Sequence, residues 1–239
     1  KQTLKSLDIK KFNELEQYIL HKVYELDVLN KDNFKNYNFH KLYKELLNFC
    51  TLDLSSFYFD IRKDVLYCDA IDSKKRKECV IVLNILLECL LKWFAPILVF
   101  TADEIYSLVS KDKQNIHENL FPEIPKSWKN ETLNEKWKQL YKIKQEANIA
   151  IEEKRANKEI GSSLEAEIKI ITNENNFNLL DGIDLSEYFI TSKAQKVKSE
   201  KKEDLVIEVK KTGGNKCPRC WKILSNKCSR CEEVISGKK

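Results

Sequence analysis

This chain of 239 residues contains no methionine, only 5 glycines and only 4 prolines. The shortage of glycine and proline excludes a collagen-like or low-complexity chain. It favours a mainly helical chain, because both residues interrupt helices. Hydrophobic residues make up 42% of the sequence, which excludes disorder throughout. A complete gene product starts with methionine, so we expect this sequence to be a piece of a longer polypeptide.

Long apolar runs are also missing. The longest stretches, over 80–91 and 93–99, are too short and too interrupted to cross a bilayer, and residues 1–10 lack the apolar core of a signal peptide. The 8 cysteines do not reach the density of a disulfide-stapled domain. The sequence therefore predicts no membrane segment and a reducing, cytoplasmic compartment.

Motifs that mark an active site are absent from the sequence. There is no glycine-rich phosphate-binding loop and no His-Glu-x-x-His motif. The three histidines, His21, His40 and His117, are scattered, with no matching acid and nucleophile nearby in sequence. We therefore expect no catalytic residues in this chain.

Apolar residues in the first half recur at three- and four-residue spacing, which is typical of helices with one buried face. The spacing predicts helices over about 12–26, 39–47 and 72–94, the last with Asp72 or Ser73 as its cap. Two capping boxes, Thr101-Ala-Asp-Glu104 and Thr132-Leu-Asn-Glu135, predict two further helix starts. The residues expected to face inward in the third helix are Val80, Leu83, Leu87, Leu90, Leu91 and Phe94.

After Gly161, which we expect to end the last helix, the apolar residues alternate as in strands with one wet face. The sequence therefore predicts a mainly α fold in three parts: an antiparallel helical bundle over 1–128, a long helix with a small α/β unit over 129–211, and a zinc-ribbon-like knuckle over 212–239. The two predicted strands are centred on Leu164, Ala166, Ile168 and Ile170, and on Leu205, Ile207 and Val209.

Two closely spaced cysteine pairs, Cys217-Pro-Arg-Cys220 and Cys228-Ser-Arg-Cys231, are the strongest local signal. Two intervening residues let a tight turn aim both sulfurs at one point, so the pairs supply four soft ligands in the tetrahedral arrangement that Zn²⁺ prefers. Four protein ligands leave no open position, and we predict one structural zinc ion. Iron and a redox dithiol are the alternatives. The remaining cysteines have no ligand spacing and are interpreted as buried thiols: Cys50, Cys68, Cys79 and Cys89.

Charge is concentrated at the end of the chain. Residues 191–239 carry 14 lysines and arginines against 6 acidic residues, a surplus of +8, whereas the rest of the chain carries −3. Such a tail either meets a polyanion or is simply a solvated lysine-rich segment. Basic residues around the cysteine pairs favour the first interpretation and are expected to be exposed, because charged groups are seldom buried unpaired. They are Arg219, Lys222, Lys227 and Arg230.

Trp221 follows the second cysteine directly. An exposed indole beside basic residues is a platform on which an unpaired base can stack. Alternatively, the indole caps the small metal core, which lacks other large apolar groups. The sequence leaves both interpretations open.

The stretch from Asn48 to Asp69, which contains Leu-Ser-Ser-Phe-Tyr and Lys-Asp-Val-Leu-Tyr, closely resembles the anticodon-binding helical domain of bacterial isoleucyl-tRNA synthetases. Further matches follow in family order over 91–98, 101–104, 160–166, 216–221 and 228–231, so the resemblance covers essentially the whole chain. Two departures are Phe100, where the family usually has histidine, and the short loop of seven residues between Cys220 and Cys228.

This resemblance implies an RNA-binding part of an enzyme that ligates isoleucine to tRNA(Ile) with ATP. The family's nucleotide-binding motifs are missing, so the catalytic and editing domains are expected upstream of Lys1 and the fragment alone is expected to be inactive. The implied partner is the tRNA(Ile) anticodon stem-loop, bound by a monomer, and Arg62 and Lys63 are two further candidate RNA contacts. The alternative is a stand-alone zinc-ribbon module that binds nucleic acid or protein without catalysis.

Overall fold

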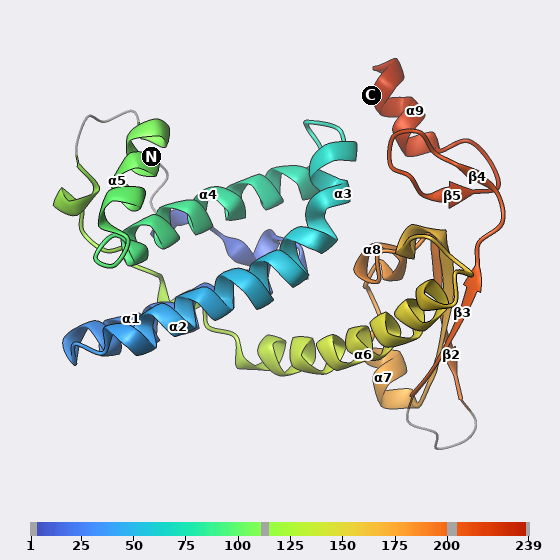
Figure 1. Cartoon of the computed structure of the whole chain (residues 1–239), viewed down its shortest axis with the longest axis horizontal. Coiled ribbons are helices and arrows are strands. Elements are labelled where there is room, and N and C mark those ends of the chain that lie inside the picture. The colour runs from blue at the N-terminus through green and yellow to red at the C-terminus, as the bar shows by residue number, and fades with distance from the viewer. Residues whose placement is uncertain (1–3, 111–114, 200–204, 238–239) are drawn as a thin grey trace. The chain divides into compact units, whose positions relative to one another are not determined.

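The computed structural model describes residues 4–110, 115–199 and 205–237 (Figure 1). The chain divides into two compact units: Lys1–Arg62 with Ile71–Glu131, here called the helical unit, and Lys63–Ala70 with Thr132–Lys239, here called the mixed unit. The division at residues 128/129 and 211/212 stays a prediction. Four lysines of the predicted basic tail lie outside the described residues: Lys201, Lys202, Lys238 and Lys239.

The helical unit confirms the prediction of a mainly α fold. Helix α1 packs against α2, α4 and a π-helical segment. Along the chain, α2, the π-helical segment and α3 follow one another without an intervening loop. Among the residues that the structure describes, no helix is long and apolar enough to cross a membrane. The elements are α1 (Glu14–Lys35), α2 (Phe39–Asn48), the π-helical segment (Phe49–Phe59), α3 (Asp60–Cys68), α4 (Lys74–Phe94) and α5 (Val99–Val109), with 3₁₀ turns at Leu4–Ser6, Ile9–Lys11, Ile116–Glu118 and Lys126–Trp128.

Helix α4 begins as predicted, but the face that it buries overlaps the predicted one only in part, with Leu91 buried as expected. The Ser73 hydroxyl caps it by accepting a hydrogen bond from the Arg76 N–H at 3.1 Å. Val80 and Leu87, which were expected to face inward, are each 38% exposed. Apolar residues occupy much of the circumference of this helix, so spacing alone leaves its orientation ambiguous by a fraction of a turn. The residues that it buries in the core include Cys79, Val82, Leu86, Cys89 and Trp93.

Both helix starts that were predicted from capping boxes were wrong. Helix α5 begins at Val99 and helix α6 (Glu131–Ala156) begins at Glu131, so Thr101 and Thr132 lie inside the helices that they were expected to cap. A turn that contains Pro96 follows α4, and α5 begins directly after it, at Val99. The start of α5 is therefore set by that turn and not by the hydroxyl.

The mixed unit contains a three-stranded sheet in the order β2-β1-β3, in which β1 pairs parallel with β2 and antiparallel with β3. The two predicted strands are β1 and β3, whereas β2 was missed. Its sequence, Lys-Ala-Gln-Lys-Val-Lys, hides the alternation because lysines protect this edge strand. The elements are β1 (Ala166–Thr172), α7 (Glu174–Leu179), α8 (Leu185–Tyr188), β2 (Lys193–Lys198), β3 (Leu205–Lys211), β4 (Asn215–Lys216), β5 (Ile223–Leu224) and α9 (Ser229–Ser236), with a 3₁₀ turn at Ser163–Glu165.

Helix α6 is anchored within this unit by α8, which lies in the parallel crossover between β1 and β2. The rings of Trp137 and Tyr188 meet edge to face, with centroids 5.7 Å apart. The buried Lys144 ammonium donates to the Tyr188 carbonyl at 2.6 Å. Buried ammonium groups are costly unless they are bonded, and this contact fixes the side chain. These two contacts therefore pack α6 against the crossover of the sheet.

Candidate metal centre and nucleic-acid interface

The structure brings the four predicted cysteine ligands together. The sulfur atoms of Cys217, Cys220, Cys228 and Cys231 all lie within 4.8 Å of one another. The Cys220 and Cys228 sulfurs are 3.8 Å apart. A tetrahedral zinc ion bonded at about 2.3 Å separates its sulfur ligands by about 3.8 Å, so the cluster fits such an ion. Three of the four cysteines are buried, which protects the site from water.

Local backbone geometry forms the first half of this cluster. Strands β4 and β5 make a short hairpin in which the Cys217 N–H donates to the Lys222 carbonyl at 2.9 Å. Gly214 has a φ of +133°, and a Cβ there would lie 2.4 Å from the Leu224 carbonyl oxygen. Only glycine fits this close approach. The backbone N–H groups of Cys220 and Arg219 overcome the effect of burial and lower the pKa of Cys217 to about 7, which favours the thiolate that a metal requires.

The second half is built by a helix end. Cys228 stands at the N-cap of α9, and Cys231 lies in the first turn of that helix. The helix N-terminus presents unpaired N–H groups and the positive end of the helix dipole, which favours negatively charged ligands such as thiolates. Gly237 adopts a left-handed conformation and ends the helix. The cysteine knuckle, defined here as residues 213–237, thus has a fold in which each ligand is placed by a turn or a helix end.

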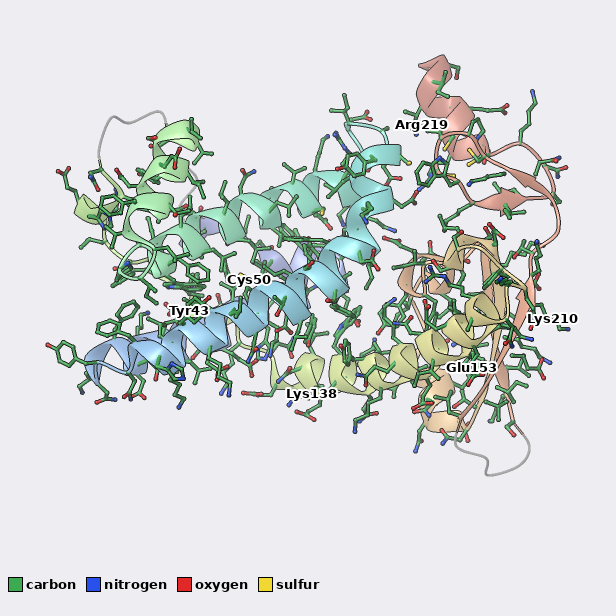
Figure 2. The ribbon with its side chains drawn as sticks, viewed as in Figure 1. Tyr43, Cys50, Lys138, Glu153, Lys210 and Arg219 are labelled. Carbon is green, nitrogen blue, oxygen red and sulfur yellow. The ribbon has the colours of Figure 1, made fainter. Side chains whose placement is uncertain are left out.

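Arg219 bonds the knuckle to the end of α3, within the mixed unit (Figure 2). Its guanidinium donates to the Cys68 carbonyl and, at 3.2 Å, to the Tyr67 carbonyl. The same group lies 3.8 Å from the Cys231 sulfur. Cys68 itself is buried among the knuckle cysteines, and its thiol donates to the Arg219 carbonyl at 3.7 Å. Arg219 therefore contacts a helix end and a cysteine of the cluster at once.

Arg230 makes a second connection to the same segment. It forms a two-pronged ion pair with Asp64, with N–O distances of 2.6 and 2.9 Å, and also bonds to Asp69 at 3.2 Å. These contacts outweigh the effect of burial and lower the pKa of Asp64. Two parallel hydrogen bonds to one carboxylate fix both groups in orientation as well as in position.

The expectation that both arginines are exposed was wrong. Arg219 and Arg230 are half-buried, and their guanidinium groups are occupied by carbonyls and carboxylates of residues 64–69. These partners are separated from the knuckle by about 150 residues of sequence, so no local pattern reveals them. Both side chains hold the knuckle in place.

Trp221 is 60% exposed, so it does not serve as a cap that is buried on the metal core. Its φ is +63°, a left-handed conformation that glycine adopts freely and that costs other residues about 1–2 kcal/mol. The Lys216 ammonium lies 5.4 Å from the centre of its ring system. A bulky side chain is therefore held in a strained backbone position and presented to solvent beside a cation.

The remaining candidate RNA contacts divide into two groups. Lys63 is exposed and so, as expected, is Lys227, whereas Lys222, which was also expected to be exposed, is half-buried. Arg62, in contrast, is buried in the helical unit, where it bonds to both carboxylate oxygens of Glu16 at 2.6 Å. A guanidinium inside the core is not available to a phosphate, and the interpretation of Arg62 as an RNA contact was wrong.

A second group of potential metal ligands, His21, Glu25 and Glu131, was missed by the sequence analysis. The Nδ1 atom of the buried His21 accepts a hydrogen bond from the Asn130 N–H at 3.0 Å. In the neutral ring Nε2 then carries the proton, and it faces a Glu25 carboxylate oxygen at 3.4 Å. This tautomer leaves no lone pair on Nε2 for a metal, so the group is a structural contact.

Comparison with known proteins identifies the family of this chain. The family model described as the anticodon-binding domain of tRNA ligase matches residues 16–170. The isoleucine–tRNA ligase of Pelagibacter ubique is 55% identical over 220 residues, which cover 92% of this chain and 24% of that protein. The corresponding enzyme of Agrobacterium fabrum is 40% identical over 220 residues, with 88% of this chain and 23% of that protein covered.

This chain belongs to the family of tRNA ligase anticodon-binding domains. The relatives that it resembles over most of its own length are isoleucine–tRNA ligases of bacteria, and the chain spans about a quarter of their length. The resemblance predicted from the residues around 48–69 is thereby confirmed.

Proposed function

We propose that this chain is the tRNA-binding part of an isoleucine–tRNA ligase, and that it binds the anticodon stem-loop of tRNA(Ile). The observation that carries this proposal is the family match over residues 16–170, together with relatives of one specificity. The whole protein would ligate isoleucine to tRNA(Ile) with ATP in the cytoplasm, as a monomer, through catalytic and editing domains in the same polypeptide.

The contribution of this part is binding energy and orientation. Contacts far from the reacting atoms place the tRNA acceptor end, and correct placement lowers the entropic part of a reaction barrier. Phosphate contacts by lysine set the register on the RNA, while stacking and base-edge contacts in the loop provide selectivity. The chain on its own would therefore bind tRNA without activating isoleucine.

A stand-alone zinc-ribbon module is the second candidate. It accounts for the cysteine knuckle, but not for the match to an anticodon-binding model that ends at residue 170, well before the first knuckle cysteine. We therefore prefer the tRNA ligase.

Zinc would have a structural role in this proposal. The four sulfurs of Cys217, Cys220, Cys228 and Cys231 would hold it, and no position is left for a substrate. The ion would fix the turns from which Trp221, Lys222 and Lys227 project. These three side chains and Lys63 are the RNA contacts that we propose, with Arg219 and Arg230 as the residues that hold the surface together.

A titration tests the function directly. The chain is titrated with the tRNA(Ile) anticodon stem-loop and with an unrelated stem-loop, each at two salt concentrations. We expect tighter binding to the first, with affinity that falls linearly in a log–log plot against salt, because each phosphate contact releases counterions. Lys227→Gln should reduce that slope by about one contact, and Glu233→Gln on the neighbouring helix is the control. Equal affinity for both loops would contradict a specific role.

The strained backbone of Trp221 gives a second test. If the indole stacks on a base, Trp221→Gly should weaken binding by about 1–3 kcal/mol and leave the salt dependence unchanged. The same change should stabilise the knuckle, because glycine relieves the left-handed strain. Loss of zinc from Trp221→Gly would show instead that the indole supports the metal core.

A further inference from the structure

The end of α3, which is hydrogen-bonded to the cysteine knuckle, carries a second exposed aromatic residue. Tyr67 is 77% exposed. Its carbonyl accepts the hydrogen bond from Arg219, which stands two residues before Trp221. We propose that Tyr67 is a second base-stacking residue, and that the end of α3 and the knuckle together form one surface for unpaired nucleotides. This inference rests on the proposed function and extends it to a residue outside the cysteine tail.

Hydrogen bonds from side chains to backbone carbonyls connect the segment that carries Tyr67 to the segment that carries Trp221. Arg219 bonds to the carbonyls of Tyr67 and Cys68, and the Cys68 thiol bonds back to the Arg219 carbonyl. The Arg230–Asp64 ion pair makes an independent connection one turn earlier in α3. A surface whose parts are held in advance loses little conformational entropy when a flexible strand binds to it.

The Tyr67 side chain has no bonding partner within the described part of the chain. Neither a hydrogen bond of its hydroxyl nor a contact of its ring with another ring is found there. Tyr58 and Tyr188, in contrast, are buried and pack against other rings. The fold therefore gives a structural role to these two tyrosines and leaves Tyr67 facing solvent.

The charges around Tyr67 suit a polyanion. Lys63 lies four residues earlier in α3 and therefore on the same helical face. The acidic groups nearby, Asp64 and Asp69, would repel phosphates, but Arg230 bonds to both. Lys222 is near enough to Asp64 to act on it electrostatically. Cations beside aromatic side chains are the combination that single-stranded nucleic acids require.

Unpaired RNA is favoured over duplex RNA as the occupant. Bases of a duplex are stacked inside the helix and offer no free face to Tyr67, whereas the bases of a loop can be splayed out. A comparison of binding to a loop RNA with binding to a duplex RNA therefore separates base stacking from simple attraction to phosphates.

The experiment uses the whole chain, loaded with zinc, and follows tryptophan fluorescence during titration with the tRNA(Ile) anticodon stem-loop. Trp93, Trp128 and Trp137 are at most 3% exposed, so a soluble quencher and a bound base report mainly on Trp221. Tyr67→Ala should weaken binding about 5- to 100-fold with an unchanged salt slope, and Tyr67→Phe should bind as the wild type does. Binding of a fully paired RNA of the same length should not change.

Two variants guard against trivial explanations. Tyr67→Leu keeps apolar bulk without an aromatic face and should lose as much affinity as Tyr67→Ala, even if the alanine variant folds poorly. Ile235→Ala, a change at an apolar residue of α9 that is 73% exposed, should have no effect. If Tyr67→Leu binds the stem-loop like the wild type while Trp221→Ala does not, the role of Tyr67 is refuted and the proposed function stands. If the wild-type chain binds no stem-loop at low salt, both are refuted.

Discussion

The largest fully buried side chains of the helical unit are Trp93, Trp128 and Tyr58, whereas the buried side chains within described residues 213–237 are three cysteines. The first region can thus draw its folding energy from apolar burial, at about 25 cal/mol for each Å² removed from water. The second region is too small for such a core, and what it has in its place is four cysteines that could hold a metal ion and two arginines that bond it to α3. We therefore expect the first region to fold by exclusion of water and the second to fold when a metal binds.

Removal of one metal ligand should produce the largest effect. Cys217→Ser replaces a thiolate by a weak ligand, and small zinc-stapled segments derive most of their folding energy from the metal. We expect less than half an equivalent of zinc, rapid proteolysis after residue 212 and little change in helical circular dichroism. Cys50→Ser is the matched control, because Cys50, which was predicted to be buried, is a half-buried thiol of the helical unit and does not belong to the cluster. Full zinc occupancy in Cys217→Ser would contradict the assignment.

The helical unit contains a buried ion pair between Arg62 and Glu16, and Arg62→Met should lower the stability of this unit. The change leaves the fully buried Glu16 carboxylate without its guanidinium partner, and a buried charge stripped of its ion pair costs about 3–5 kcal/mol. Urea unfolding should show this loss, while zinc content stays normal. Lys63→Met, one residue further on at an exposed position, should change stability by no more than about 0.5 kcal/mol. The double variant Glu16→Gln/Arg62→Met should recover part of the loss.

Acid should lower the stability of the helical unit through Glu25, independently of the cysteine cluster. The neighbouring His21, against the effect of burial and with help from Lys22, lowers the pKa of Glu25 from 4.5 to about 2. A carboxylate whose pKa is lower in the folded state stabilises the protein above pH 4.5, and that contribution is lost as the pH falls towards 2. For this partly exposed group we expect about 1 kcal/mol. Unfolding midpoints measured between pH 7 and 3 should decline less for Glu25→Gln than for the wild type.

The smallest effect is expected at Lys158, where a substitution should raise stability, whereas the preceding changes should lower it. The prediction that Gly161 ends α6 was wrong, because the helix ends at Ala156 and the left-handed residue after it is Lys158, with a φ of +58°. The Glu159 N–H bonds to the Lys154 carbonyl at 3.0 Å as in a glycine-capped helix end. Lys158→Gly should stabilise the mixed unit by about 0.5–1 kcal/mol, since relief of left-handed strain exceeds the added freedom of the unfolded chain. Lys158→Ala keeps the Cβ and should bring no gain in thermal unfolding experiments.

The cluster of four cysteines was predictable from the sequence because its signal is local. Ligand type and spacing over 15 residues fix the geometry of the cluster, and β1 was likewise found from the alternation that begins near Ala166. The partners of Arg62 and Arg230 could not be predicted in the same way. Their carboxylates lie 46 and 166 residues away in sequence, and only the folded chain brings them together. Whether an arginine bonds to protein or to RNA depends on those distant groups.

The prediction of which face of α4 is buried failed in part, for a different reason. Its apolar residues extend around the helix, so no single stripe marks the face that meets the core. The identity of the helix was clear, and its cap at Ser73 was found, but the choice of face is made by the neighbouring helices. Tertiary packing decides such cases, and a periodicity cannot.

The π-helical segment over Phe49–Phe59 has a consequence for how this chain can vary in length. Its wider turns contain more residues than α-helical turns, and it joins α2 to α3 without a loop that could absorb a shift. A wide turn that loses one residue can tighten to an α-helical turn, so Arg62, Lys63 and Tyr67 would keep their faces of the helix. One added residue has no such outlet and would rotate everything after it by about 100° around the helix axis. Insertions are therefore expected to be more damaging here than single-residue deletions.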